Sequence, residues 1–304
     1  MHEVITVQKF SENEWLIDGI LEGNPNAQNL IIMLNEGGYT KDENGVFPVI
    51  KNNIIQKKDN KIIFQTKKYG NYEILVNTII KDQKFCTFRY DLRNHGQSLV
   101  NGKMDKRDTL YTRLAKDLRD VLKYLKNKYS FQKIYFIGTG VGALTIEYYL
   151  TKLNEIPIND IKKVYLICPN SPQIIYNVNP KYQFIYQKQE YLLQHNEQFT
   201  KVKGIFEGKK TLYEAEENYN IEIEYAKLQL PTIYFLSTTD KLIPIEIYLK
   251  ILAQVQKINA QIEYEIISKI IDYGNTDHGL YDNESSTYVL TKIIQSILND
   301  WVVK

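Results

Sequence analysis

The sequence predicts the α/β class, as a mostly parallel, doubly wound sheet with helices on both faces and an inserted helical cap. Short apolar runs of the kind that parallel sheets bury on both faces alternate along the chain with segments of helical periodicity. A long polar and aromatic stretch interrupts this alternation near the middle of the chain. The 304 residues are 43% hydrophobic and 24% charged, which is the composition of an ordinary globular protein with a sizeable core.

The first third of the chain is rich in predicted strands. The runs NLIIML over Asn29 to Leu34 and FCTFRY over Phe85 to Tyr90 are bounded apolar segments typical of buried strands. Between them, Tyr72 to Lys81 has the spacing of a helix, whereas residues 45–68 fit either a hairpin or irregular cover. Two short strands are expected before these elements, over residues 2–9 and 14–21.

Helices and strands keep alternating in the rest of the chain. The segment from Arg107 to Tyr129 carries leucines and a valine at three-to-four-residue intervals, the apolar stripe of a helix that lies on a sheet. By the same patterns, strands are expected over Lys133 to Ile137, Val164 to Cys168 and Thr232 to Leu236, and helices over Ala143 to Leu153 and Tyr288 to Val303.

The polar and aromatic stretch over residues 171–230 is predicted to be a cap or lid. Loops of this length are seldom without function, and the stretch has helical pieces near residues 182–199 and 211–228. We therefore expect one core, formed by residues 1–170 and 231–304, with residues 171–230 inserted over one end of its sheet.

Composition and charge exclude several classes of function. Thirty-eight Lys and Arg against 36 Asp and Glu leave a formal charge of +2, so no basic field favours a nucleic-acid partner. No segment has the apolar length of a transmembrane helix, and no motif has the ligand spacing of a metal or nucleotide site, so we expect no metal and no cofactor. Cys86 and Cys168 lie in apolar runs as small buried hydrophobes, and the chain has no leader pattern, which together predict a cytoplasmic protein.

A glycine-rich turn joins the strand at Lys133 to the helix that follows. Its residues are Gly138, Thr139, Gly140, Val141 and Gly142, which is the strand-turn-helix context of the nucleophile elbow G-x-S-x-G. The flanking glycines allow a sharp turn that passes close to its neighbours, and the middle residue normally presents a side-chain oxygen above the sheet. Here the middle position is Gly140, so the serine is missing.

At this point the sequence resembles the α/β-hydrolase superfamily, over nearly the whole chain. The segment from Phe88 to Ser98, FRYDLRNHGQS, is similar to the D-x-R-G-x-G-x-S segment after a core strand of many members, with Asn94 in place of the first glycine. Asp240 follows the strand TIYFL as the family's acid does, and His278, in Asp-His-Gly ahead of the last helix, corresponds to its histidine. The order of nucleophile position, acid and histidine is the family's order.

The resemblance implies a role for each of these residues. A carboxylate such as Asp240 holds an imidazole such as His278 in one tautomer and stabilises its cation, which leaves the other ring nitrogen as general base. Gly140 has no side chain, so a covalent acyl-enzyme is excluded at that position. We do not expect the neighbouring Thr139 to replace it, because the turn should point its hydroxyl elsewhere.

The family's oxyanion hole implies two backbone donors. One is the N–H after the nucleophile position, on Val141, and the other comes from the loop after the strand NLIIML, at Glu36 or Gly37. That loop, LNEGGY, is similar to the family's His-Gly loop but has no histidine.

The glycine-rich turn alone also fits a Rossmann-like dinucleotide site, with Ala143 at the third glycine position. A Rossmann turn is expected near the first strand, so the hydrolase interpretation is favoured. The leading hypothesis is a carboxylic-ester or thioester hydrolase lineage, acting on a small-molecule acyl substrate or ligand, with its serine replaced by Gly140. Two alternatives stay open: an Asp240–His278 general-base enzyme, such as a lyase, cyclase or non-covalent hydrolase, and a non-catalytic ligand-binding or receptor-like protein. The sequence favours no oligomeric state.

Overall fold

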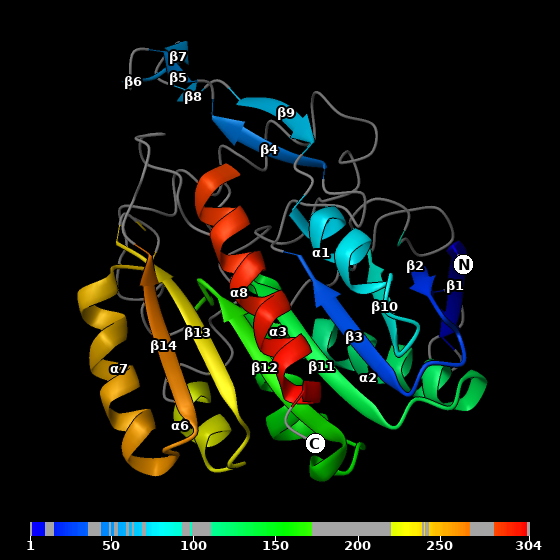
Figure 1. Ribbon diagram of the computed structural model, residues 1–304. Helices are drawn as coiled ribbons and strands as arrows, with labels where there is room; N and C mark the ends of the chain where they lie inside the picture. Colours follow the sequence, from blue (N-terminus) through cyan, green and yellow to red (C-terminus); the bar gives the residue numbers. More distant parts are fainter. Residues whose placement is uncertain are drawn as a thin grey trace.

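The structure is a computed structural model in which one large sheet carries helices on both faces (Figure 1). It describes residues 2–9, 15–35, 44–48, 50–51, 54–58, 61–62, 64–68, 71–92, 98, 111–171, 220–238, 240, 243–267 and 283–302. The main sheet has eight strands in the order β1-β2-β10-β3-β11-β12-β13-β14. These strands are β1 (His2–Lys9), β2 (Trp15–Gly23), β3 (Asn29–Leu34), β10 (Phe85–Tyr90), β11 (Lys133–Thr139), β12 (Ile161–Ile167), β13 (Thr232–Ser237) and β14 (Ile262–Ile267).

The sheet is mostly parallel, as predicted. Strands β10, β3, β11, β12, β13 and β14 pair in parallel, whereas β1 and β2 form an antiparallel edge that joins β10. All residues of β3 and of β10 are buried, which fits strands covered on both faces. The predicted bounds of these two strands are confirmed residue by residue.

Residues 44–68 form short antiparallel pairs outside the main sheet. Their strands are β4 (Asn44–Pro48), β5 (Ile50–Lys51), β6 (Ile54–Ile55), β7 (Lys57–Lys58), β8 (Lys61–Ile62) and β9 (Phe64–Lys68). Strand β4 pairs with β9, β5 with β6, and β7 with β8. Of the two expectations for this region, the paired arrangement is the one found.

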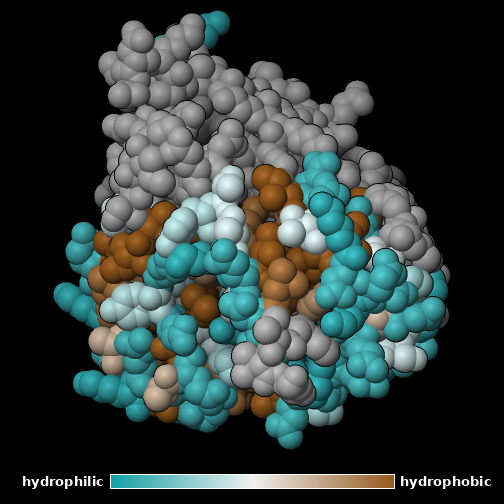
Figure 2. All heavy atoms as spheres, in the orientation of Figure 1, coloured by the Kyte–Doolittle hydropathy of each residue, from teal (hydrophilic) through white to brown (hydrophobic). Residues whose placement is uncertain are grey.

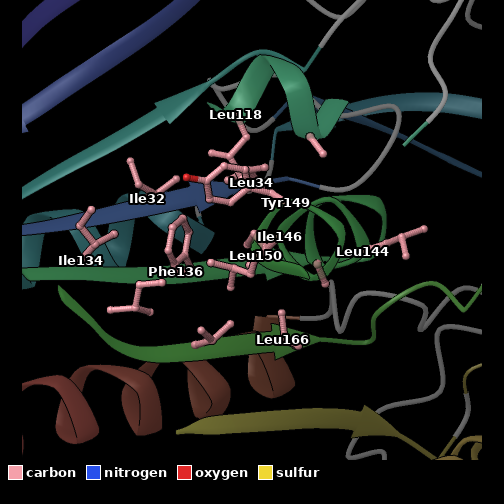
Figure 3. Packing of buried hydrophobic residues seen from close by; sticks show 14 of the residues in the cluster. Ile32, Leu34, Leu118, Ile134, Phe136, Leu144, Ile146, Tyr149, Leu150 and Leu166 are labelled. Atoms are coloured by element: carbon pink, nitrogen blue, oxygen red, sulfur yellow. The ribbon is translucent and has the colours of Figure 1, made fainter. Parts of the chain in front are cut away.

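A hydrophobic cluster lies on each face of the sheet. On one face, α1 (Asn71–Ile79) and α8 (Asn283–Val302) pack on side chains such as Ile31 and Tyr135. On the other face, α2 (Tyr111–Lys128), α3 (Val141–Tyr148), α6 (Ile221–Ala226) and α7 (Ile245–Ile258) pack on side chains such as Ile32 and Phe136. Figure 3 shows this second cluster, where Leu118 of α2 and Ile146 of α3 approach the strands.

The helices differ in detail from the sequence prediction. The helix expected over Ala143 to Leu153 begins two residues earlier, at Val141, and after Tyr148 continues as a π-helical turn, Tyr149–Leu153. A 3₁₀ turn, Ile158–Asp160, then leads into β12. The sequence interpretation missed α7 and β14 altogether, and α6 lies within the helical piece expected over residues 211–228.

The carboxyl ends of the parallel strands lie at one end of the sheet, where Gly140 follows β11 and Asp240 comes after β13. Gly138 of β11 pairs with Leu34, the last residue of β3, and Thr139 pairs with Ile167, the last residue of β12. Figure 2 shows a mostly hydrophilic face, on which the hydrophobic residues gather mainly in the upper half of the coloured surface. Ligands of open α/β sheets bind outside the carboxyl ends of the strands.

Candidate active site

The turn between β11 and α3 places Gly140 in a conformation that L-residues rarely adopt. Its φ is 53° and its ψ is −113°. The Gly140 N–H donates to the Ile167 carbonyl at 2.9 Å, and its own carbonyl accepts from Asn170 N–H and Leu144 N–H, each at 3.2 Å. These bonds from the neighbouring strand end and the following helix hold the position in a strained strand-to-helix turn of the nucleophile-elbow type.

The flanking glycines are required by close backbone packing. A β-carbon on Gly138 would lie 2.6 Å from the α-carbon of Ala143, and one on Gly142 would lie 2.4 Å from the Leu34 carbonyl oxygen and 2.7 Å from that of Asn35. Real side chains do not tolerate such distances from backbone atoms. Both positions therefore exclude every residue except glycine, as the motif predicted.

Thr139 points to the opposite side of the sheet from α3. Its side chain is buried, and its hydroxyl lies 2.9 Å from the hydroxyl of Tyr72, on α1. This hydrogen bond directs the Thr139 oxygen into the α1 face, so the geometry argues against Thr139 as a substitute nucleophile.

Val141 is the first residue of α3. Its N–H belongs to the first helical turn, whose N–H groups have no partner within the helix and carry the positive end of the helix dipole. Such a group is suited to the oxyanion role predicted for it. Asn35, at the end of β3, lies against Gly142, while the other predicted donors, Glu36 and Gly37, lie outside the described residues.

Asp240 follows β13 at the same edge of the sheet. The residue is 8% exposed, and its Oδ1 atom accepts a hydrogen bond from the Ile243 N–H at 2.8 Å. This bond fixes the carboxylate in place at the start of the segment that leads to α7. His278, the predicted partner of Asp240, lies outside the described residues.

A pair of buried carboxyl groups lies beneath the turn, and the sequence interpretation missed it. Glu147 of α3 and Glu222 of α6 are both 0% exposed. The Tyr234 hydroxyl donates to Glu147 Oε1 at 2.8 Å. Neither Glu147 Oε2 nor either Glu222 oxygen has a hydrogen-bond partner among the described residues. The sequence did contain a signal for a buried carboxyl group. Glu147 lies four residues after Ala143, and therefore on the same face of a mostly apolar helix.

The surroundings of this pair favour the neutral acid. Burial raises the pKa of Glu147, and the nearby charge of Glu222 raises it further, whereas the Tyr234 hydroxyl lowers it. Burial also raises the pKa of Glu222, against a lowering by the Ser171 hydroxyl, which lies close without reaching hydrogen-bond geometry. Both carboxyls therefore hold their protons to higher pH than an exposed glutamate.

The described part of the chain brings no three His, Cys, Asp or Glu side chains together in a way that could hold a metal ion. Cys86 and Cys168 are both buried, as predicted, and they form no disulfide with each other. Within the described ranges, none of the helices combines the length and apolarity needed to cross a membrane.

The chain belongs to the family described as "Alpha/beta hydrolase of unknown function (DUF915)", which matches residues 53–215, more than half of the chain. None of the curated protein sequences matches it. The superfamily and the fold predicted from the sequence are thereby confirmed.

Solved structures of esterases share the fold at low sequence identity. An esterase of Pyrococcus furiosus aligns with a TM-score of 0.60 at 15% identity, over 96% of this chain and 91% of that chain. A carboxylesterase structure from Nitrososphaera gargenis gives 0.63 at 12% identity, over 97% of this chain and 100% of that chain. A protein of Butyrivibrio proteoclasticus with ferulic acid bound gives 0.59 at 14% identity, over 99% and 100%. At these identities the likeness establishes the fold.

Proposed function

We propose that this chain carries the site of a carboxylic-ester or thioester hydrolase in which Gly140 occupies the position of the nucleophilic serine. The conformation of Gly140, with φ 53° and ψ −113° between a strand and a helix, carries the proposal. A turn without a functional side chain would not require this conformation, nor the close packing that makes glycine obligatory at positions 138 and 142. The turn is the kind that presents a side-chain nucleophile, which indicates descent from proteins that had one.

The other residues have the following roles in the proposal. Asp240 is the acid that orients His278, and His278 is the general base. The N–H of Val141, with that of Glu36 or Gly37, binds the acyl oxygen of a small-molecule substrate and stabilises the charge that develops on it. The proposed cap lies within residues 171–230, over a core made of 1–170 and 231–304, but α6 at the end of that stretch packs on the sheet as part of the core. A cytoplasmic location is supported by the two buried cysteine thiols, which form no disulfide with each other.

The test is to compare this chain with Gly140→Ser on a panel of short and long p-nitrophenyl esters and on thioesters. We expect the serine variant to hydrolyse at least one class with burst kinetics, because acylation then precedes deacylation. The control is Gly140→Ala, which introduces a β-carbon without an oxygen and should stay silent. If the serine variant is folded and silent on every ester and thioester, the proposal is wrong.

A second candidate is a general-base enzyme built on Asp240 and His278 without a covalent intermediate. The fixed, buried Asp240 carboxylate favours it, because an acid with no histidine to orient would gain nothing from burial. It predicts that the unaltered chain has a turnover of its own, which His278→Ala abolishes. Binding of acyl compounds that survives both Asp240→Asn and His278→Ala would instead favour a non-catalytic receptor.

A further inference from the structure

We propose that Tyr72 is a positioning residue of this site, and that its hydroxyl fixes the start of the oxyanion segment relative to the turn at Gly140. The proposal rests on the proposed function, because it concerns how the same site holds its backbone donors. Its basis is a chain of side-chain and backbone contacts that crosses from β11 to α1 and returns to the end of β3.

The first link is a pair of hydrogen bonds with one defined direction. The Tyr72 hydroxyl, on a residue 2% exposed, donates to the Leu34 carbonyl at 3.2 Å. A phenol has one proton, so once it is given to Leu34 the 2.9 Å contact with Thr139 requires the Thr139 hydroxyl to donate to Tyr72. Thr139 directly precedes Gly140, which ties the turn to the end of β3 through Tyr72.

The second link is the backbone of Leu34 itself. Its carbonyl oxygen is confined from the other side by Gly142, where a β-carbon would lie only 2.4 Å away. Because the peptide unit is planar, fixing the Leu34 carbonyl also fixes the direction of the Asn35 N–H. The contacts on Leu34 thus set where the segment with the predicted oxyanion donors begins.

The hydroxyl of Tyr72 can be separated from its ring. The ring packs in the cluster shared by α1, α8 and the sheet, together with Ile31 and Met33. A phenylalanine would keep this apolar packing and lose both hydrogen bonds. Tyr72→Phe therefore tests the hydroxyl while leaving the core filled.

The kinetic test is made in the Gly140→Ser protein. Tyr72→Phe and Thr139→Val should each lower kcat by about tenfold or more and leave KM within about twofold, because misplaced oxyanion donors fail mainly in the transition state. Thr139→Ser, which keeps the hydroxyl, should restore the rate. The double variant should lose little more than the worse single one, because both residues act through one chain of contacts.

The matched control is Tyr225→Phe. The Tyr225 hydroxyl makes a similar buried contact with a threonine, at 2.7 Å from Thr232, but lies between α6 and β13 and touches neither Leu34 nor Gly140. It should change thermal stability by an amount comparable to Tyr72→Phe and leave kcat unaltered. Equal kinetic effects of the two variants would mean that Tyr72 is merely structural.

A second readout does not depend on catalysis. In the unaltered Gly140 chain, Tyr72→Phe should speed amide hydrogen exchange at Asn35 by about tenfold, and Tyr225→Phe should not. If Gly140→Ser proves inactive, the proposed function fails, and this exchange measurement still decides the role of Tyr72. Exchange at Asn35 that is the same in both phenylalanine variants would overturn the inference.

Discussion

The Leu34 carbonyl oxygen lies so close to Gly142 that a β-carbon there would be 2.4 Å away. Backbone atoms of the central strand β3 form this contact, so the structure has no flexible group that can move aside. We expect Gly142→Ala to lower the free energy of unfolding by at least about 2–3 kcal/mol, the upper part of the range for overpacking. Denaturant unfolding measures this, and a loss below that of Gly140→Ala would contradict it.

At Gly140 the expected cost comes from backbone conformation. Any L-residue at φ 53° and ψ −113° is strained, by about 1–3 kcal/mol. Gly140→Ser and Gly140→Ala should therefore both unfold at lower denaturant concentration than the unaltered chain, by similar amounts. If the serine variant is as stable as the glycine chain, the turn has relaxed, and its activity would no longer report on this geometry.

The buried carboxyls predict a pH dependence of stability. The pKa of Glu147 and that of Glu222 are raised in the folded state, above an unfolded value of about 4.3. The stability contributed by the neutral acids is therefore complete below that unfolded pKa and is lost as pH rises through the raised folded values. Between the unfolded and the folded values the loss is about 1.4 kcal/mol per pH unit for each carboxyl, and above the folded values it is complete.

The measurement for this prediction is urea unfolding from pH 5 to pH 9. The glutamine side chains of Glu147→Gln and Glu222→Gln cannot ionise. In each variant the free energy of unfolding should therefore decline less steeply with pH than in the unaltered chain. The control is Glu224→Gln on the same helix, where Glu224 forms an exposed pair with Lys227. A steeper decline in either buried variant would show that these carboxyls are ionised and stabilising.

Asp240→Asn separates charge from structure at the acid position. The amide oxygen of asparagine can still accept from the Ile243 N–H, so the fold should be retained. In the Gly140→Ser protein, kcat should fall by about 10⁴-fold, because the histidine loses the carboxylate that sets its tautomer and stabilises its cation. The control is Asp160→Asn, because Asp160 directly precedes β12 and so lies at the opposite ends of the parallel strands from Asp240. A similar loss of kcat in both variants would remove Asp240 from the proposed acid role.

The parts of the fold that the sequence predicted well are those with strong local patterns. Mostly apolar runs predicted β3 and β10 with their bounds, because strands buried on both faces have few polar positions; Asn29, Thr87 and Arg89 are buried exceptions. In β14 the exposed Glu263 and the half-buried Glu265 break that pattern, and the strand was missed. The start of α3 was predicted two residues late, because the helix begins at Val141, directly after Gly140 and inside the glycine-rich segment that was interpreted as a turn.

The candidate site divides in the same way. The turn at Gly138, Gly140 and Gly142 was predictable from its local strand–glycine–helix pattern, although the contact that requires glycine at 142 comes from Leu34, far away in the chain. The contact of Tyr72 with Thr139, and the buried pair of Glu147 and Glu222, join residues far apart in the chain. No local pattern specifies which distant side chains meet, so these features required the folded structure.

Ser171 and Glu222 lie beside one another, although the chain between residues 171 and 220 runs outside the described structure. A chain that departs and returns at neighbouring points need not span any fixed distance in between. Its length and composition can then change at a small cost in loop-closure entropy, with the sheet and the turn at Gly140 undisturbed. The sheet and the turn at Gly140 therefore place little constraint on the number of residues that join Ser171 to Asn220.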